Sequence, residues 1–98
     1  MNGHLITLEL KVNNHPGVMM HIVSLFARRA FNLEGIACFP CRDRQFSRIW
    51  LRVLEDARVG QIIAQLEKLV DVIDVIQHPV SHESFVKLES FFTEEKFQ

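Results

Sequence analysis

The residues best suited to chemistry are the run Asn13, Asn14, His15, Pro16, Gly17 and Val18. This run separates an alternating apolar stretch from one with helical spacing, so it is a strand-to-helix turn. Asparagine favours turns, proline favours the first turn of a helix, and glycine lets another molecule approach its backbone closely. Because free N–H groups lie at a helix start, the turn suits a carboxylate or a phosphate. An ordinary helix start is the simpler interpretation.

A second candidate is the pair Cys38 and Cys41, which has the Cys-x-x-Cys spacing of redox and metal sites. Redox pairs lie at a helix N-terminus, whereas this pair ends an expected strand. Residues three apart on a strand point to opposite faces, so the thiols meet only if the chain turns at Pro40. A metal also needs two more ligands, and the sequence has no second cysteine pair. We therefore favour a structural or incidental role for this pair and expect no metal site.

The remaining polar residues form no catalytic set. His15 is the one histidine in the central turn, where it is a possible additional contact to a bound ligand. No serine has a G-x-S-x-G context, and no glycine-rich phosphate loop occurs. The scattered carboxylates are interpreted as solubilising or capping groups: Glu9, Glu34, Asp43, Glu55, Asp56, Glu67, Asp71 and Asp74. We expect no catalysis and no catalytic residues in this chain alone.

The elements that must position the turn follow from apolar spacing. Alternation predicts strands over 4–12, 32–41 and 46–54, and an apolar run predicts a well-buried fourth strand over 72–77. Helical spacing predicts helices over 18–30 and 55–70. The order strand, helix, strand, strand, helix, strand predicts an α+β, ferredoxin-like βαββαβ fold. In that fold both helices cover one face of a four-stranded antiparallel sheet.

The other face of the sheet is left open. We place Trp50, Ala37 and Phe39 on it, and such a face predicts a partner. The domain is expected to span 1–79, and the tail 80–98 to be helical or partly disordered. Apolar residues with helical spacing in the tail are Phe85, Leu88, Phe91 and Phe92.

Composition excludes several function classes. The formal net charge is −1, and acidic and basic residues are interspersed, which argues against binding to nucleic acid or to anionic membranes. Arg48, Trp50 and Arg52 share a strand face as in RNA-binding sheets, but the aromatic-rich pattern of those strands is missing. No apolar run is long enough to span a membrane and no signal peptide is evident, so a cytoplasmic protein is expected.

Four segments carry a family resemblance. They are NHPGV (14–18), LFARRAFNLEGI (25–36), SRIWL (47–51) and LEKLVDV (66–72). Together they resemble the small regulatory subunits of acetolactate (acetohydroxyacid) synthase, and the short length is similar to that of the bacterial isozyme I type. That family uses an ACT domain, which has the βαββαβ fold expected here from periodicity.

The resemblance implies a homodimer that joins two sheets side by side and binds a branched-chain amino acid, foremost valine, between the chains. By position, Asn14, Gly17 and Val18 match one side of that site, and Asn32 and Leu33 match the partner side. Backbone N–H groups of the turn would take the carboxylate, the two asparagines the amino group, and the apolar residues the side chain.

The resemblance also implies a large catalytic subunit as partner, which carries thiamine diphosphate, Mg²⁺ and FAD. This chain would hold no cofactor, would activate that subunit, and would mediate feedback inhibition by valine. Longer members have a second C-terminal domain, so activation here is expected from the ACT domain and tail. Candidate contacts to the catalytic subunit are Arg28, Arg29, Phe85, Leu88 and Phe92.

Two alternatives stay open. One is a free-standing ACT-type sensor of an amino acid that has no enzyme partner. The other is a redox or metal protein that uses Cys38 and Cys41.

Overall fold

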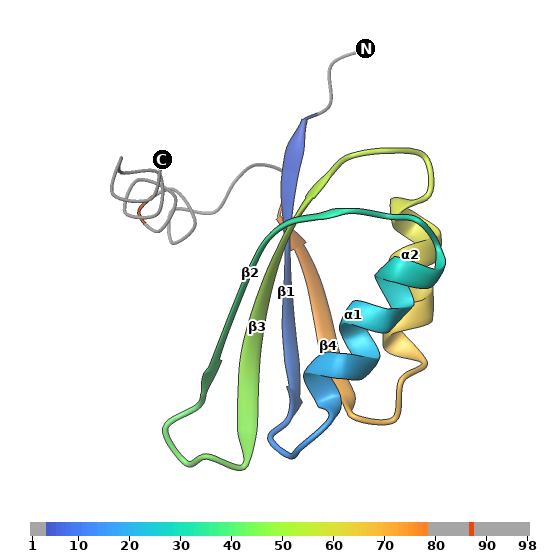
Figure 1. The fold of residues 1–98 in the computed structure, drawn as a ribbon. Helices are drawn as coiled ribbons and strands as arrows, with labels where there is room; N and C mark the ends of the chain where they lie inside the picture. The colour runs from blue at the N-terminus through green and yellow to red at the C-terminus, as the bar shows by residue number, and fades with distance from the viewer. Residues whose placement is uncertain (1–3, 79–86, 88–98) are drawn as a thin grey trace, which may run out of the picture.

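The expected strands and helices form in the expected order in a computed structural model, which describes residues 4–78 and residue 87 (Figure 1). Their bounds are β1 Leu5–Asn13, α1 Val18–Arg28, β2 Leu33–Pro40, β3 Phe46–Leu54, α2 Val59–Glu67 and β4 Val72–His78. The predicted strand over 46–54 matches β3 at both ends.

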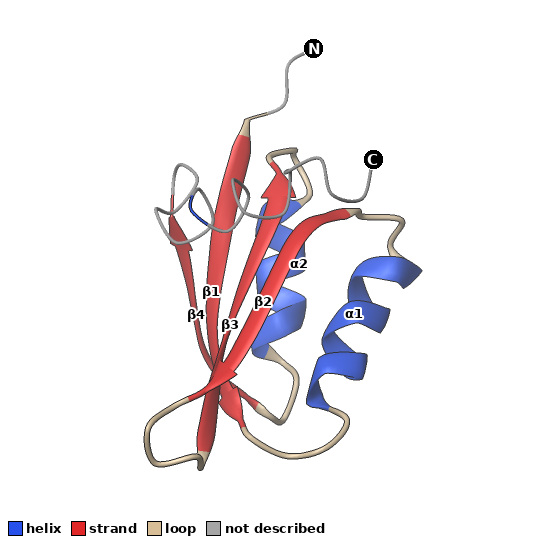
Figure 2. Ribbon diagram, turned by 60° about the vertical axis from the view of Figure 1, so that its left-hand side comes forward, coloured by secondary structure: helices blue, strands red, loops and turns tan. Residues whose placement is uncertain are grey.

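The strands form one four-stranded sheet in the order β2-β3-β1-β4, and each neighbouring pair is antiparallel. Both helices lie on one side of this sheet, and among the described residues no element covers the other side, which is called the open face (Figure 2). The predicted ferredoxin-like βαββαβ fold is therefore confirmed. Because β1 is central, its last residue lies beside the start of β4, and this pairing matters for the turn that follows β1.

The core lies between the sheet and the helices. Alternate residues of β1 and β3 point toward the helices, as their period-two pattern predicts. The helical stripes of α1 and α2 cover them, and Phe26 packs edge-on against Phe31 with ring centroids 5.8 Å apart. The core residues of these four elements are Ile6, Leu8, Leu10, Val12, Val18, Ile22, Leu25, Phe26, Ile49, Leu51, Val53, Val59, Ile62 and Leu66.

Both helices are shorter than predicted, for local reasons. Helix α1 ends at Arg28 because Ala30 adopts a left-handed conformation with φ 52°. Helix α2 begins at Val59, because the Asp56 carboxylate accepts the backbone N–H of Arg58 at 2.6 Å in a turn before the helix. It ends at Glu67, so Val70 lies outside the helical stripe and is 88% exposed.

The prediction that the fourth strand is well buried is wrong. Strand β4 lies at an edge of the sheet, where the open face and the free edge leave Ile76 46% exposed. A register shift against β1 between Lys11 and Val12 leaves Ile73 outside the pairing, and it is 52% exposed. An apolar run alone does not distinguish a central strand from an edge strand.

The open face carries the residues expected on it. Ala37 pairs with Trp50 and Phe39 pairs with Arg48, so these side chains share one face. Phe39 is 65% exposed. The predicted tail residues Phe85, Leu88 and Phe92 lie outside the described residues. Within the part of the chain that is described, no helix is long and apolar enough to cross a membrane.

Candidate functional site

The turn between β1 and α1 presents an exposed helix start. Gly17 precedes α1 with φ 92°, a left-handed conformation that side chains disfavour, and this explains the glycine. A Cβ at Gly17 would meet no atom of the described residues within 4 Å, so these residues leave the backbone open to approach. In the described part of the chain, no side chain caps the start of α1. The first N–H groups of the helix are therefore suited to an external acceptor.

The loop between β2 and β3 holds one side of this turn. The backbone N–H of Asn14 donates to the Gln45 carbonyl at 2.9 Å. The side-chain amide of Asn14 donates to the Arg44 carbonyl at 2.8 Å. Asn14 is exposed, so these bonds orient its side chain at the surface rather than burying it.

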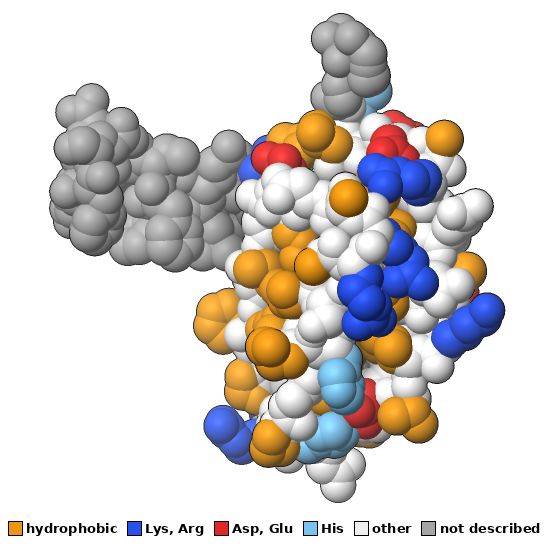
Figure 3. Space-filling view, turned by 45° about the vertical axis from the view of Figure 1, so that its right-hand side comes forward, with side chains coloured by type: hydrophobic (Ala, Val, Ile, Leu, Met, Phe, Trp, Pro, Cys, Tyr) orange, Lys and Arg blue, Asp and Glu red, His pale blue; other side chains and the backbone are white. Residues whose placement is uncertain are grey.

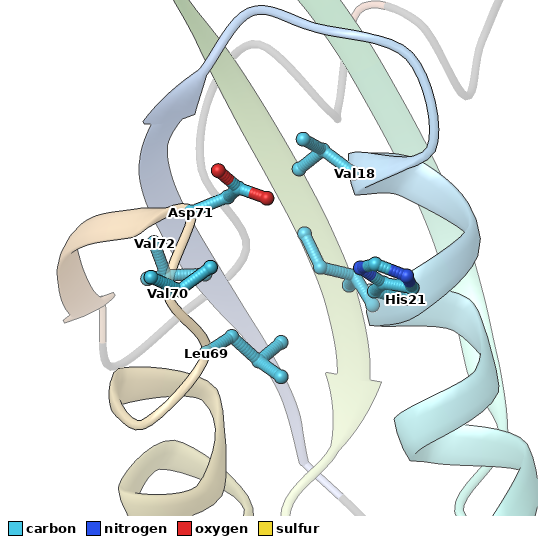
Figure 4. Close-up of a pocket in the computed structure, with 7 residues that line it drawn as sticks. Val18, His21, Leu69, Val70, Asp71 and Val72 are labelled. Carbon is cyan, nitrogen blue, oxygen red and sulfur yellow. The ribbon is translucent and has the colours of Figure 1, made fainter.

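Asp71, in the connection between α2 and β4, holds the other side. Its Oδ1 accepts from Asn13 Nδ2 at 3.2 Å and from His15 Nε2 at 2.6 Å. The backbone N–H of Asn13 also donates to the Asp71 carbonyl at 2.9 Å. Acidic and histidine side chains adjoin at this end of the helix-covered side (Figure 3), and Asp71 points toward the start of α1 (Figure 4).

The same contacts shift the ionisation of both partners. The Pro16 carbonyl, 2.9 Å from His15 Nδ1, and the Asp71 carboxylate raise the pKa of His15. Hydrogen bonds from His15 and Asn13 lower the pKa of Asp71. Both pKa shifts favour the charged forms, which are an imidazolium for His15 and a carboxylate for Asp71.

A small cavity of about 120 Å³ lies between the start of α1 and the connection from α2 to β4 (Figure 4). Its lining is mainly aliphatic, with Asp71 and His21 at the wall: Val18, His21, Ile22, Leu69, Val70, Asp71 and Val72. Of the residues predicted to bind valine, this cavity includes Val18 alone.

The two halves of the predicted valine site do not meet within one chain. Asn32 and Leu33 lie beyond the far end of α1, whose 11 residues span about 16 Å. The side-chain amide of Asn32 donates to Glu34 Oε2 at 2.9 Å, and Leu33 is half-buried at the start of β2. A site that uses both halves needs a second copy of the chain.

Comparison with known proteins decides the family. Residues 8–74 match the family model of the AHAS small subunit-like ACT domain. The chain is 51% identical over 87 residues to acetolactate synthase isozyme 1 small subunit of Escherichia coli K12, which covers 89% of this chain and 91% of that protein. The chain belongs to the acetolactate synthase small-subunit family.

Longer family members are also similar. The acetolactate synthase small subunit of Mycobacterium bovis is 38% identical over 92 residues, and the match covers 86% of this chain and 54% of that protein. The crystal structure of the acetolactate synthase small subunit from Thermotoga maritima superposes with a TM-score of 0.70 at 27% identity. That match covers 91% of this chain and 68% of the other, so the ACT fold is shared.

In this small-subunit fold, the two arginines at the C-terminal end of α1 have different surroundings. Arg28 is exposed in the last turn of α1. Arg29 is half-buried and donates to the Leu25 carbonyl at 3.3 Å, while its own carbonyl accepts from Arg58 at 2.9 Å. Arg28 is thus the better placed of the two for an external contact.

The cysteine pair does not have the environment of a redox site. Cys38 and Cys41 are both free thiols, and Cys38 pairs with Ile49 across the strands. Burial raises the pKa of the Cys38 thiol, which disfavours the reactive thiolate. Over residues 4–78, no group of three or more potential ligands is arranged to hold a metal ion.

Sequence reasoning identified Asn13 as part of the turn but missed its partner Asp71. Asp71 was treated as one of many solubilising carboxylates, although it directly precedes the fourth strand. In the expected fold that strand pairs antiparallel with the first, and Val12 lies opposite Val72. This pairing alone places Asp71 beside Asn13, so topology combined with the sequence carried the signal.

Proposed function

We propose that this protein is the regulatory subunit of an acetolactate synthase and that it binds valine as a feedback effector. The observation that carries the proposal is the exposed, glycine-led start of α1 in a chain of this family. A free amino acid has one carboxylate, one ammonium and one side chain. The turn and the start of β2 together offer a matching group for each.

The carboxylate lies against the backbone N–H groups of Gly17 and Val18. Those groups open α1, where the helix dipole favours an anion. The left-handed conformation at this position favours glycine, and glycine has no side chain that would obstruct the carboxylate. The side-chain oxygen of Asn14, whose amide nitrogen is held by the β2–β3 loop, accepts from the ammonium.

The second half of the site comes from a partner copy. Asn32 and Leu33 lie too far from the turn to act in the same chain, since α1 separates them by about 16 Å. In a homodimer with joined sheets, Asn32 of one chain adds an acceptor for the ammonium, and Leu33 packs on the apolar side chain together with Val18. Valine fits this pairing because its side chain is small and branched.

Regulation follows from the shared site. An effector bound between two copies stabilises one arrangement of the dimer over another, and a large catalytic subunit in contact with the dimer responds to that shift. We assign thiamine diphosphate, Mg²⁺ and FAD to that catalytic subunit, which makes acetolactate. Arg28 on this chain, with the tail residues Phe85, Leu88 and Phe92, is proposed to contact it.

Calorimetric titration of the purified full chain with valine tests the binding step. We expect saturable binding of valine, weaker binding of leucine and isoleucine, and none of glycine. Asn14→Ala should abolish it, while Gln61→Ala, an exposed change on α2, should bind as the wild type does. Failure of every amino acid to bind would contradict the effector site.

Reconstitution with the large subunit tests the regulatory role. The small subunit should raise acetolactate formation, and valine should lower it again. A free-standing sensor would bind valine without changing that activity. If truncation after Pro79 and Arg28→Glu both leave activation intact, the proposed contact surface is wrong.

A further inference from the structure

His15 has two acceptors and can satisfy both in one protonation state. Its Nε2 is 2.6 Å from Asp71 Oδ1, and its Nδ1 is 2.9 Å from the Pro16 carbonyl oxygen. A carbonyl and an ionised carboxylate only accept hydrogen bonds, and a neutral imidazole has a single N–H to donate. Both contacts are therefore hydrogen bonds at the same time only in the imidazolium, which donates from both nitrogens.

The bond to Pro16 acts on the proposed effector site. The Pro16 carbonyl and the Gly17 N–H belong to one planar peptide unit, so fixing the oxygen also fixes the direction of the N–H. Gly17 itself does little to fix that direction, because glycine adopts positive and negative φ about as readily. The contact from the His15 ring to the Pro16 carbonyl oxygen therefore favours the orientation that this peptide has where φ is 92° at Gly17.

We infer that His15 is a positioning residue whose proton, anchored by Asp71, orients the Gly17 N–H and so couples effector binding to pH. This inference rests on the proposed function, because it concerns the regulation of the same site. It assigns His15 to the backbone of the turn rather than to direct contact with the ligand.

Asp71 is suited to the role of anchor. Its side chain is 15% exposed and takes a second hydrogen bond from Asn13, so the carboxylate stays in place when the histidine changes charge. The His15 side chain is 49% exposed, so solvent protons reach it freely. The raised pKa of His15 agrees with this arrangement.

The other groups around the turn determine which control variants the test needs. From α1, His21 adds a favourable charge interaction with Asp71 and lines the adjacent cavity (Figure 4). From the β2–β3 loop, Arg44 and Gln45 meet the turn through their backbone carbonyls. His21 is therefore the second titratable group whose contribution has to be separated from that of His15.

The test measures valine binding to the full chain from about pH 6 to about pH 8.5, a range that brackets the ordinary histidine pKa. We expect the Kd of the wild type to rise about five- to tenfold across that range, at the low end of typical coupling between sites. His15→Gln should bind valine weakly at every pH. This variant is also the control for ionisation of valine itself, because any pH dependence of the Kd that comes from the ligand should persist in it. Asp71→Asn should move the transition to lower pH, whereas His21→Gln should keep it.

A second readout does not depend on the ligand. In NMR spectra of the free protein, both ring nitrogens of His15 should be protonated at the acid end of this pH range, and the Gly17 amide shift should follow the His15 titration. A Kd that is constant with pH while His15 titrates would overturn the inference and leave the proposed function standing. Absence of valine binding at every pH would contradict the proposed function, and a Gly17 amide that ignores His15 would overturn the inference separately.

Discussion

Two histidine–carboxylate pairs lie in different parts of this molecule. His15 and Asp71 are 2.6 Å apart beside the β1–α1 turn, and His78 and Glu9 are 3.0 Å apart on the open face of the sheet. The two carboxylates are almost equally covered, with side chains 15% and 14% exposed. The two pairs differ in the further groups that their side chains contact.

At the turn, His15 also contacts the Pro16 carbonyl oxygen, and the positively charged partner of Asp71 is a histidine. On the open face, Glu9 also accepts from Arg48, whose guanidinium lies over the Trp50 ring, and Trp50 stacks on His78. Burial acts to raise the pKa of Glu9, but the hydrogen bonds from Arg48 and His78 outweigh it and lower that pKa. Arginine keeps its charge, so Glu9 has a permanently charged partner in Arg48, whereas the partner of Asp71 is a histidine that can lose its proton.

The change expected to have the largest effect is Gly17→Ala at the turn. Because φ is 92° at this position, the substitution should lower the free energy of unfolding by about 1–2 kcal/mol. Valine affinity should also decrease, because the turn is part of the proposed site. Gly60→Ala in α2 is the matched control, because a Cβ there also meets nothing within 4 Å but φ is helical. Chemical denaturation should show stabilisation or no change for Gly60→Ala. Equal losses for both would mean that the turn has no special backbone requirement.

A smaller effect is expected from Glu9→Gln on the open face, about 1 kcal/mol at neutral pH, between exposed and buried ion pairs. Because the folded pKa of Glu9 is lowered, its contribution is complete above the unfolded pKa and is lost as pH falls through the folded pKa. Unfolding curves from neutral to acid pH should therefore converge for wild type and variant. The exposed change Glu55→Gln should show little difference at any pH. A constant gap for Glu9→Gln would assign its effect to packing.

A still smaller effect, of opposite pH dependence, is expected from His15→Gln. The raised folded pKa of His15 means that its contribution is complete below the unfolded pKa and is lost as pH rises through the folded pKa. Asp71, with a lowered pKa, adds the requirement that pH stay above its own folded pKa. The midpoint of thermal unfolding should differ between wild type and variant in mildly acid solution and agree in alkaline solution. A difference that persists at alkaline pH would contradict the imidazolium pair.

The smallest effect is expected from the double change Cys38→Ser and Cys41→Ser. Neither thiol takes part in the turn or the open-face network, and surface substitutions away from such features usually stay within about 0.5 kcal/mol. Valine affinity and stability should match the wild type with and without reductant. A dependence on reductant in the wild type alone would revive the redox alternative.

The fold was predictable because β1 and β3 alternate cleanly and the helices carry apolar stripes. Strand β4 shows what apolar patterning does not predict, which is the position of a strand in the sheet. Ile73 and Ile76 are apolar yet exposed, because β4 is an edge strand. The start of α2 was predicted too early, because acidic residues favour a helix N-terminus but Asp56 instead closes a turn onto Arg58.

The backbone of the candidate site was predictable from the sequence, but the side-chain hydrogen bonds that hold it in place were not. Glycine after proline indicates a special turn, and the sequence therefore identified Gly17. The partners of His15 are 56 residues away and one residue away, and only the first needs tertiary structure. The Glu9 network joins three strands through side chains that alternation places on one face without saying which of them pair.

The central claim is that each effector site is shared by two chains. The most direct test combines Asn14→Ala and Asn32→Ala in one heterodimer, isolated with two different affinity tags and titrated with valine. Each variant alone should fail to bind, and the heterodimer should recover one site, built from the intact turn of one chain and the intact start of β2 of the other. No recovery, or normal binding by Asn32→Ala alone, would contradict the claim and point to a site within a single chain.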